Sequence, residues 1–374
     1  MQKKLIALAI AGLGLTASAA FAQSNVTIYG LMDASVDVTK NGDSNSGIQG
    51  IRTTKISSNT SRIGFKGSED LGDGLKAVFQ IESAINVDNN NGGSGGAGAW
   101  NSRNTYVGLA GGWGSVKLGN IDTPYKTSTA GFDLFRDHLA DNRNLMGKGL
   151  VNFDQRASST VRYESADYNG FSFAAAHVAG AENATTSGPA PVFPDQKKGN
   201  AWSLSGTYTN GPWTGTLAHE RHNFGSGGTG TISSFANVDK QEKATKLGVG
   251  YQADAFRVGF AYEHTSDDFT FHQGHNAWTL GGGYTFGNNE AKLAYTKAGT
   301  ISGTSDTGAK QWAIGIDHIL SKRTLVYAEY VKLSNDNAAT YGLTGAGGFT
   351  TGAVSPIGAG ADPSALQFGI KHAF

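Results

Sequence analysis

The feature that most constrains this chain is an alternation of apolar and polar side chains with a period of two residues. In the segment 26–39, even positions are apolar or small and odd positions are mostly polar. Similar runs recur at 256–263, 278–286 and 366–374. A period of two predicts β-strands with one apolar and one polar face. The chain is therefore expected to be an all-β protein.

The connections between these runs predict the topology. Short sequences rich in Gly, Asn and Asp join pairs of runs at 70–74, 111–114, 167–170, 210–212, 252–255, 287–290 and 321–323. Longer polar segments alternate with them at 40–55, 86–102, 120–155, 179–199, 221–244, 264–276, 297–310 and 334–364. Seven short and eight long connections join sixteen strands and place both chain ends at the rim of short turns. An even strand number with short turns at one rim is typical of outer-membrane barrels.

The polar face of the strands favours a membrane barrel over a soluble one. A soluble barrel turns its apolar face inward, and side chains could not fill an interior bounded by sixteen strands. Here the polar face carries mostly Gly, Thr, Ser and charged residues, which suit a water-filled interior. We predict a sixteen-stranded antiparallel transmembrane β-barrel with short periplasmic turns and long external loops. A secreted β-sandwich or solenoid is the alternative, but it does not readily give strictly alternating short and long connections.

Composition excludes several other classes. The 54 Gly residues are about twice the usual share of ~7 %, yet only 7 Pro are present, which argues against a disordered or collagen-like chain. The absence of Cys excludes disulfide scaffolds and thiolate metal sites. Lys and Arg together number 30, as do Asp and Glu, so no charge excess suggests a nucleic-acid partner.

The first 22 residues have the composition of a secretory signal peptide. Lys3 and Lys4 are followed by an apolar stretch, 5–19, and by the small-x-small sequence at 20–22 that a signal peptidase cuts. The apolar stretch is shorter than the ~20 residues that a spanning helix needs. We expect a signal peptide at 1–22 and one barrel domain at 23–374, exported to the outer membrane of a Gram-negative bacterium.

Several segments carry a family resemblance: Val26–Asp33, Ser61–Gly72, Gly74–Glu82, Tyr106–Leu109 and Gly369–Phe374. With these segments the mature chain resembles the general porins of β-proteobacterial outer membranes. The resemblance implies a homotrimer of sixteen-strand barrels that passes small hydrophilic solutes by diffusion, without a cofactor. It also implies that the third long segment folds into the lumen and that Phe374 is the terminal aromatic recognised by the barrel-insertion machinery. Outer-membrane lipid and lipopolysaccharide would surround such a barrel.

The third long segment is the candidate for one side of a pore constriction. Phe132, Phe135 and Leu139 fall at helical spacing, as do the carboxylates of Asp133, Asp137 and Asp141. A short helix would place the apolar side chains on one surface and an acidic lip on another. The alternative is a solvated helix face on an external loop, which loop length and the family resemblance disfavour.

Parity along the strands supplies the opposite, basic wall. Because their apolar neighbours must face lipid, the side chains of Arg62, Lys66, Glu82, Lys117, Arg156, Arg162 and Glu164 are expected to point into the lumen. Counting from the short turns places Arg62 and Arg162 at mid-barrel, and Lys66 and Lys117 near the short-turn rim. Arg103 matches an Arg of the family near the pore, although parity would place it on the lipid side unless a bulge or the second loop intervenes. The family usually has Arg where this chain has Asn120, which leaves charge selectivity open between anions and cations.

A few residues bear on functions other than a channel. The pairs His219/His222 and His272/His275 could suggest metal sites, but they read better as solvated loop histidines. Gly281–Gly283 lies inside a strand and is not a phosphate loop, and no nucleophile triad is apparent, so we expect no enzyme. A substrate-specific channel for organic acids or sugars remains the alternative. It would show an aromatic ladder or a dense track of one charge sign, whereas the inward residues are mixed.

Overall fold

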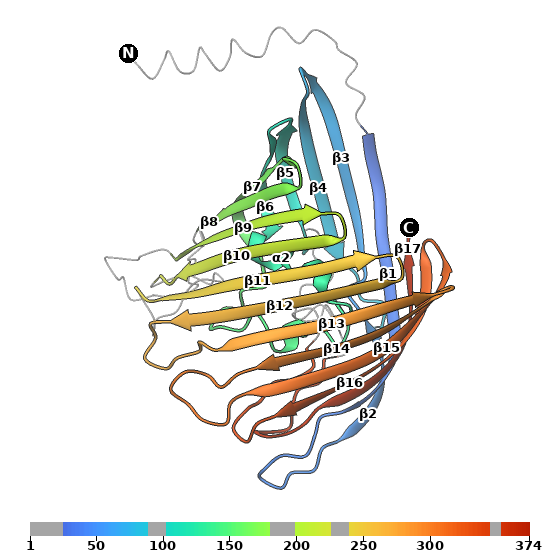
Figure 1. Ribbon diagram of the computed structural model, residues 1–374, viewed down its shortest axis with the longest axis vertical. Helices are drawn as coiled ribbons and strands as arrows, with labels where there is room; N and C mark the ends of the chain where they lie inside the picture. Colours follow the sequence, from blue (N-terminus) through green and yellow to red (C-terminus); the bar gives the residue numbers. More distant parts are fainter. Residues whose placement is uncertain (1–24, 89–101, 180–198, 226–238, 345–352) are drawn as a thin grey trace, which may run out of the picture.

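The computed structural model describes residues 25–88, 102–179, 199–225, 239–344 and 353–374, so the predicted signal peptide lies outside the described residues. These residues form one antiparallel sheet that closes on itself. The closing strand is β1 (Asn25–Lys40), which pairs with β17 (Ser364–Ala373) on one side and with β2 (Arg52–Ser58) and β3 (Arg62–Gly72) on the other. In Figure 1 the red β17 accordingly lies beside the blue β1.

The other strands follow in sequence order around the barrel, each paired with the next. They are β4 (Leu75–Ala84), β5 (Thr105–Gly111), β6 (Gly114–Asp122), β7 (Arg156–Ser165), β8 (Phe171–Val178), β9 (Asn200–Asn210), β10 (Trp213–Asn223), β11 (Gln241–Ala253), β12 (Phe256–Asp267), β13 (Asn276–Phe286), β14 (Asn289–Ala298), β15 (Ala309–Ser321) and β16 (Thr324–Asn335).

The segments β2 and β3 are two halves of one barrel strand, interrupted by a bulge. On β1 two residues separate the positions that pair with Ser58 and Arg62, whereas three residues, 59–61, lie between Ser58 and Arg62 themselves. The extra residue is accommodated by the left-handed backbone of Thr60, with φ of 55°. The seventeen strand segments therefore make sixteen barrel strands, and the predicted barrel is confirmed.

The connections alternate as the sequence indicated. Short turns occupy 73–74, 112–113, 166–170, 211–212, 254–255, 287–288 and 322–323. Long connections occupy 41–51, 85–104, 123–155, 179–199, 224–240, 268–275, 299–308 and 336–363. No helix among the described residues is long and apolar enough to cross a membrane.

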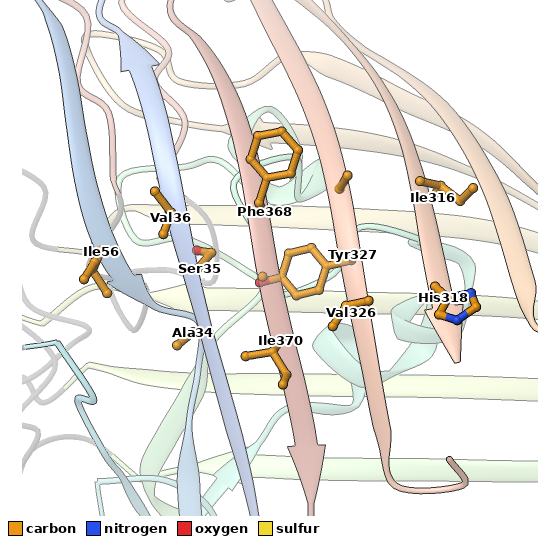
Figure 2. Close-up of a pocket in the computed structure, with 12 residues that line it drawn as sticks. Ala34, Ser35, Val36, Ile56, Ile316, His318, Val326, Tyr327, Phe368 and Ile370 are labelled. Atoms are coloured by element: carbon orange, nitrogen blue, oxygen red, sulfur yellow. The ribbon is translucent and has the colours of Figure 1, made fainter. Parts of the chain in front are cut away.

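The apolar faces of the strands point outward. On β17, Leu366, Phe368 and Ile370 are exposed, whereas Gln367 between them is buried in the interior. Figure 2 shows the outer face where the barrel closes, a groove of about 610 Å³ between side chains of β1, β2 and β15–β17. Contact with lipid removes this apolar surface from water. The aromatic side chain of Tyr29 on β1 points inward, where its hydroxyl donates a hydrogen bond to Glu82.

Candidate functional site

The third long connection, residues 123–155, lies inside the barrel, and we call it the inner loop. It begins with the short helix α2 (Pro124–Ser128), which contacts β8, β9 and β10 and appears inside the barrel in Figure 1. The side chain of Thr123 caps this helix by accepting from the backbone N–H of Lys126, and Pro124 occupies the first turn. Two single 3₁₀ turns follow, η1 (Ala130–Phe132) and η2 (Asn142–Asn144). The predicted folding of this loop into the lumen is therefore observed.

Glycines on the inner face of the barrel form the surface on which the loop rests. A Cβ atom added at Gly248 or Gly250 would lie 2.4 or 2.5 Å from the ring of Phe132. A Cβ at Gly315 would lie 2.9 Å from Phe135, and Leu134 meets Gly281 in the same way. These distances are shorter than side chains allow, so the close approach of loop and wall requires glycine. The remaining members of this surface are Gly259 and Gly283.

The tip of the inner loop is fastened to the wall by His138. Its Nε2 lies 3.1 Å from Oδ2 of Asp33 on β1, and its Nδ1 lies 3.0 Å from Oε2 of Glu329 on β16. The ring stacks on Tyr327 with 4.4 Å between centroids, and all of these side chains are buried. Burial opposes the charged ring, but the carboxylates of Glu329 and Asp33 raise the pKa of His138 to about 10. At neutral pH the tip is thus an imidazolium between two carboxylates.

Further carboxylates hold the returning limb of the loop. Glu263 on β12 accepts from the backbone N–H of Gly147 at 2.7 Å, and Glu242 on β11 accepts from Leu150 N–H at 2.8 Å. His222 on β10 lies 2.8 Å from Glu242 through its Nδ1, and its ring stacks on Phe153 of the loop. The inner loop is consequently bound to the wall from β10 to β16 and to β1.

The predicted helix across the inner loop is wrong. Residues 133–141 form no helix, because Asp137 has a left-handed backbone with φ of 72° and the carboxylates bond to loop backbone instead. Asp133 accepts from Phe135 N–H and from Asn142 N–H, both at 2.9 Å. Such side-chain to backbone bonds compete with helical ones.

The three aspartates surround an arginine within the loop. Asp137 and Asp141 both pair with Arg143, and Asp141 is fully buried, so it does not line open water. The side chain of Asp137 keeps 26 % of its surface exposed. Although burial opposes ionisation, the guanidinium of Arg143 holds the pKa of Asp137 well below its usual range. Burial and the charge of Asp141 raise the pKa of Asp133 to about 7. Asp137 is the one of the three that stays both ionised and partly exposed.

The opposite wall, β3–β7 with residues 103 and 126, carries a cluster of cations around three carboxylates; we call it the basic wall. Arg103 and Arg62 lie 2.6 and 3.9 Å from Glu82. Arg156 and Lys126 lie 3.0 and 2.9 Å from Asp122, and Arg162 and Lys117 both pair with Glu164. Among the described residues, these ion pairs thus join six cations to three carboxylates.

Two residues of the basic wall lie elsewhere than residue counts along the strands predict. Arg103 precedes β5 in the second long connection, and its guanidinium reaches inward to Glu82, so strand parity does not apply to it. Lys117 is directly opposite Arg162 in the register of β6 and β7, so it lies at the height of that arginine and not nearer the rim. Lys66 lies over the ring of Tyr29, 5.1 Å from its centroid.

The remaining candidates are separated by the fold. His219 lies on the outer face beside Thr245, whereas His222 is buried inside, so the two rings cannot share a metal. His272 is exposed beside Asp267 and His275 is buried, so the interpretation of all four as solvated was wrong for His222 and His275. No cluster of three or more His, Asp or Glu side chains suited to a metal occurs in the described ranges. Phe374 exchanges backbone hydrogen bonds with Gly30 and packs its ring there, which fastens the chain end to β1.

Sequence reasoning missed His138, Glu329, Glu242 and Glu263. All four lie on the expected inward side or in the inner loop, but nothing local indicates which distant partners they meet. The glycines did give a signal: Gly248 and Gly250, like Gly281 and Gly283, repeat with a period of two on the inner face. Such a repeat indicates that another backbone or ring approaches the strand closely.

Comparison with known proteins agrees with this geometry. Residues 7–338 match the family model for Gram-negative porins. The outer membrane porin protein 32 of Delftia acidovorans is 30 % identical over 384 aligned positions, which cover 100 % of both chains. A major outer membrane protein P.IB of Neisseria gonorrhoeae is 29 % identical and covers 87 % of this chain and 91 % of its own.

Solved structures give the same result. The anion-selective porin from Comamonas acidovorans superposes with a TM-score of 0.72 at 27 % identity, covering 94 % of this chain and 100 % of its own. OmpT of Vibrio cholerae shares the fold, with a TM-score of 0.65 at 15 % identity, over 94 % of this chain and 98 % of its own. The closed sixteen-strand barrel, with its apolar exterior and charged interior, agrees with these relatives. The chain therefore belongs to the Gram-negative porin family and is a porin channel of the outer membrane.

Proposed function

We propose that this porin is a general diffusion channel for small hydrophilic solutes and that it favours anions. The observation that carries the preference is the basic wall, where six cations share three carboxylates. Charges that line a narrow lumen act at close range on passing ions and raise the concentration of the opposite sign. The similar porin from Comamonas acidovorans, described as anion-selective, supports the same sign.

The inner loop adds little net charge against this wall. With Lys126 counted in the basic wall, residues 123–155 carry four cations and four carboxylates. The cations are Arg136, His138, Arg143 and Lys148, and the carboxylates are Asp133, Asp137, Asp141 and Asp154. The constriction proposed here consists of Arg62, Arg103, Arg156 and Arg162 on one side and the loop with Asp133, Asp137 and Asp141 on the other. The field across it orders water and disfavours apolar solutes.

A general channel is favoured over a substrate-specific one by the mixed character of the lumen. Cations of the basic wall alternate with Glu82, Asp122 and Glu164, so this part of the inner face carries both charge signs. A channel specific for organic acids or sugars would be blocked by a low concentration of its solute. Planar-bilayer conductance should instead rise in proportion to salt for several small ions.

The test of anion preference is the reversal potential across a KCl gradient. The wild-type channel should give the sign expected for chloride permeation. The double variant Arg62→Ala plus Arg162→Ala should move the potential toward zero by roughly half or more, because two cations leave the wall. Arg323→Ala, which removes an exposed arginine in a short turn, is the matched control and should leave the potential unchanged. A cation-selective wild type, or a double variant like the control, would overturn the preference.

We also propose a homotrimer, embedded in outer-membrane lipid and lipopolysaccharide and assembled by the barrel-insertion machinery through Phe374. Support comes from the outward apolar strand faces and from a related Vibrio cholerae barrel described in a trimer form. Insertion into planar bilayers in triple conductance steps would support the trimer, and single steps would contradict it.

Cleavage after residue 22 is tested by the intact mass of the exported protein. A lipid-hydrolase assay on the purified protein should show no activity, since the relatives are channels.

A further inference from the structure

Three lysines lie on the outer face of the barrel at the rim of the long connections. They belong to three neighbouring strands, β14, β15 and β16, which lie side by side in Figure 1: Lys297, Lys310 and Lys332. The residues on either side of them along the chain are buried: Thr296, Ala298, Ala309, Gln311, Val331 and Leu333. Because successive residues of a strand point to opposite faces, the three lysines point away from the lumen. We call them the outer lysines.

The protein does not balance the charges of the outer lysines. Lys297 and Lys310 are direct partners in the register of β14 and β15, and like charges in such positions destabilise a sheet. The ion pairs that β14–β16 form within the described residues all use inner-face carboxylates, namely Glu290, Asp317 and Glu329. Asp306 and Asp336, in the adjoining connections, form no ion pair with the outer lysines. A negative charge from outside the chain would relieve this repulsion.

A row of aromatic rings lies beside the outer lysines, on the side toward the middle of the barrel. On each strand an aromatic residue stands two positions from the lysine, about 7 Å along the strand: Tyr295, Trp312 and Tyr330. Tyr295 pairs with Trp312 in the register, and the ring centroids of Trp312 and Tyr330 are 5.2 Å apart. In membrane barrels such rings lie at the boundary between hydrocarbon and headgroups. The ammonium groups of the outer lysines therefore lie at the level of the lipid headgroups.

The outer face is hollowed into a mostly apolar groove next to this aromatic row. The groove has a volume of about 900 Å³, and its outward lining includes Leu293, Tyr295, Ile314, Ile316, Tyr330 and Leu366. It is recessed because Gly282, Ala291 and Ala328 have short side chains or none. The charged residues that border it point into the lumen, where each has an ion partner: Arg257, Lys292 and Glu329. An acyl chain in this groove would remove its apolar surface from water.

We propose that this face binds lipopolysaccharide through its phosphorylated glycolipid, lipid A, with phosphate on the outer lysines and an acyl chain in the groove. The inference rests on the proposed embedding in lipopolysaccharide and specifies where the barrel holds that lipid. An ammonium offers three donors and a full positive charge to phosphate oxygens. A phosphate between Lys297 and Lys310 replaces their repulsion by two attractions. A lipid with an uncharged headgroup would fill the groove but leave the lysines unbalanced.

The experiment is native mass spectrometry of the purified barrel, washed free of lipid in detergent and titrated with bisphosphorylated lipid A. We expect one lipid A per chain, bound about tenfold more tightly than the same lipid without its phosphates. Lys297→Gln plus Lys310→Gln should weaken lipid A binding about tenfold, because two cations near the headgroups are removed. Inorganic phosphate at the same concentration should not compete, since it has no acyl chain.

The matched control is Lys322→Gln plus Arg323→Gln, which removes two exposed cations from a short turn at the opposite rim and should bind as the wild type does. Both double variants should keep the wild-type conductance and reversal potential, which checks that they are folded. If the wild type retains lipid A and Lys297→Gln plus Lys310→Gln retains it equally, the site is overturned and the embedding in lipopolysaccharide stands. A wild type that retains none overturns both.

Two further outcomes would also overturn the proposal. Phosphatidylglycerol that binds as tightly as lipid A would show that the face does not select a glycolipid. The double variant Arg221→Gln plus Lys243→Gln removes another pair of cations that face each other across two strands, outside the groove. An equal loss of lipid A binding in this variant would show that charge at the rim is sufficient without the groove.

Discussion

The wall from β10 to β16 holds the inner loop on glycines and compensated charges, whereas the basic wall across the lumen has more cations than carboxylates. On the first wall the carboxylates of Glu329 and Glu242 bind loop atoms, namely the ring of His138 and the backbone N–H of Leu150. On the second, Arg62 keeps 27 % of its side chain exposed and lies 3.9 Å from Glu82. Under the proposed function, the first wall positions the loop that narrows the lumen, and the basic wall sets which ions pass.

The largest expected effect comes from breaking the loop side at Glu329. Glu329→Gln leaves the buried charges of His138 and Lys292 with one carboxylate fewer. Removing one partner of a buried ion pair typically costs about 3–5 kcal/mol, so the loop tip should detach from β16. Single-channel records should then show frequent conductance flicker at neutral pH. Glu69→Gln, an exposed glutamate near a short turn, is the control. Quiet channels from Glu329→Gln would show that the tip contact does not hold the loop.

A second prediction tests the glycine surface beneath the loop. Leu in place of Gly250 would occupy the position of the Phe132 ring, and overpacking of this kind typically costs about 1–3 kcal/mol. The loop should move toward the lumen and lower the single-channel conductance. Gly215 has no atom within 4 Å of a Cβ position, so Gly215→Leu should keep the wild-type conductance. Equal conductance in both variants would show that the loop does not depend on Gly250.

The third prediction tests the basic wall by changing its ratio of cations to carboxylates. Glu82→Gln leaves six cations with two carboxylates and keeps a hydrogen-bond acceptor for Tyr29. The chloride preference should increase, by about twofold in permeability ratio, because the local field becomes more positive. The reversal potential in a KCl gradient measures this shift. A shift toward cations would mean that Arg62 and Arg103 left the lumen when their partner was removed.

Local sequence patterns were sufficient for the barrel because each strand carries its own signal. Alternation in 26–39 gave the two faces of β1, and Gly-rich turns gave the strand number. The bulge at residues 59–61 was missed because its side-chain bonds go to other strands: Ser61 accepts from Asp33 N–H of β1, and Asn59 donates to the Tyr327 hydroxyl of β16. The helix expected over 132–141 failed because short-range bonds of Asp133 outweigh the helical spacing.

The candidate site shows the same distinction: local patterns predicted some of its features, and features that depend on distant residues were missed. Parity placed the basic wall residues Arg62, Arg162 and Glu164 inside, because each strand has one lipid face. Heights along the barrel were less predictable: Lys117 and Arg162 proved to be direct neighbours, since residue counts from separate turns ignore the register between strands. Contacts of the inner loop required the closed barrel, because His138 meets Asp33 and Glu329 from 105 and 191 residues away.

The smallest expected effect is a change with pH that separates the two walls. The pKa of His138 is raised to about 10 in the folded loop, above the 6.5 of an ordinary histidine. The stabilisation from its charge is therefore complete below about pH 6.5 and is lost as the pH rises through about 10. Channel flicker should change little from pH 7 to pH 8 and increase toward pH 10, whereas the arginines of the basic wall stay charged and ion preference should persist. His138→Gln should flicker at every pH. Flicker that is independent of pH in the wild type would mean that the charge of His138 does not fasten the loop.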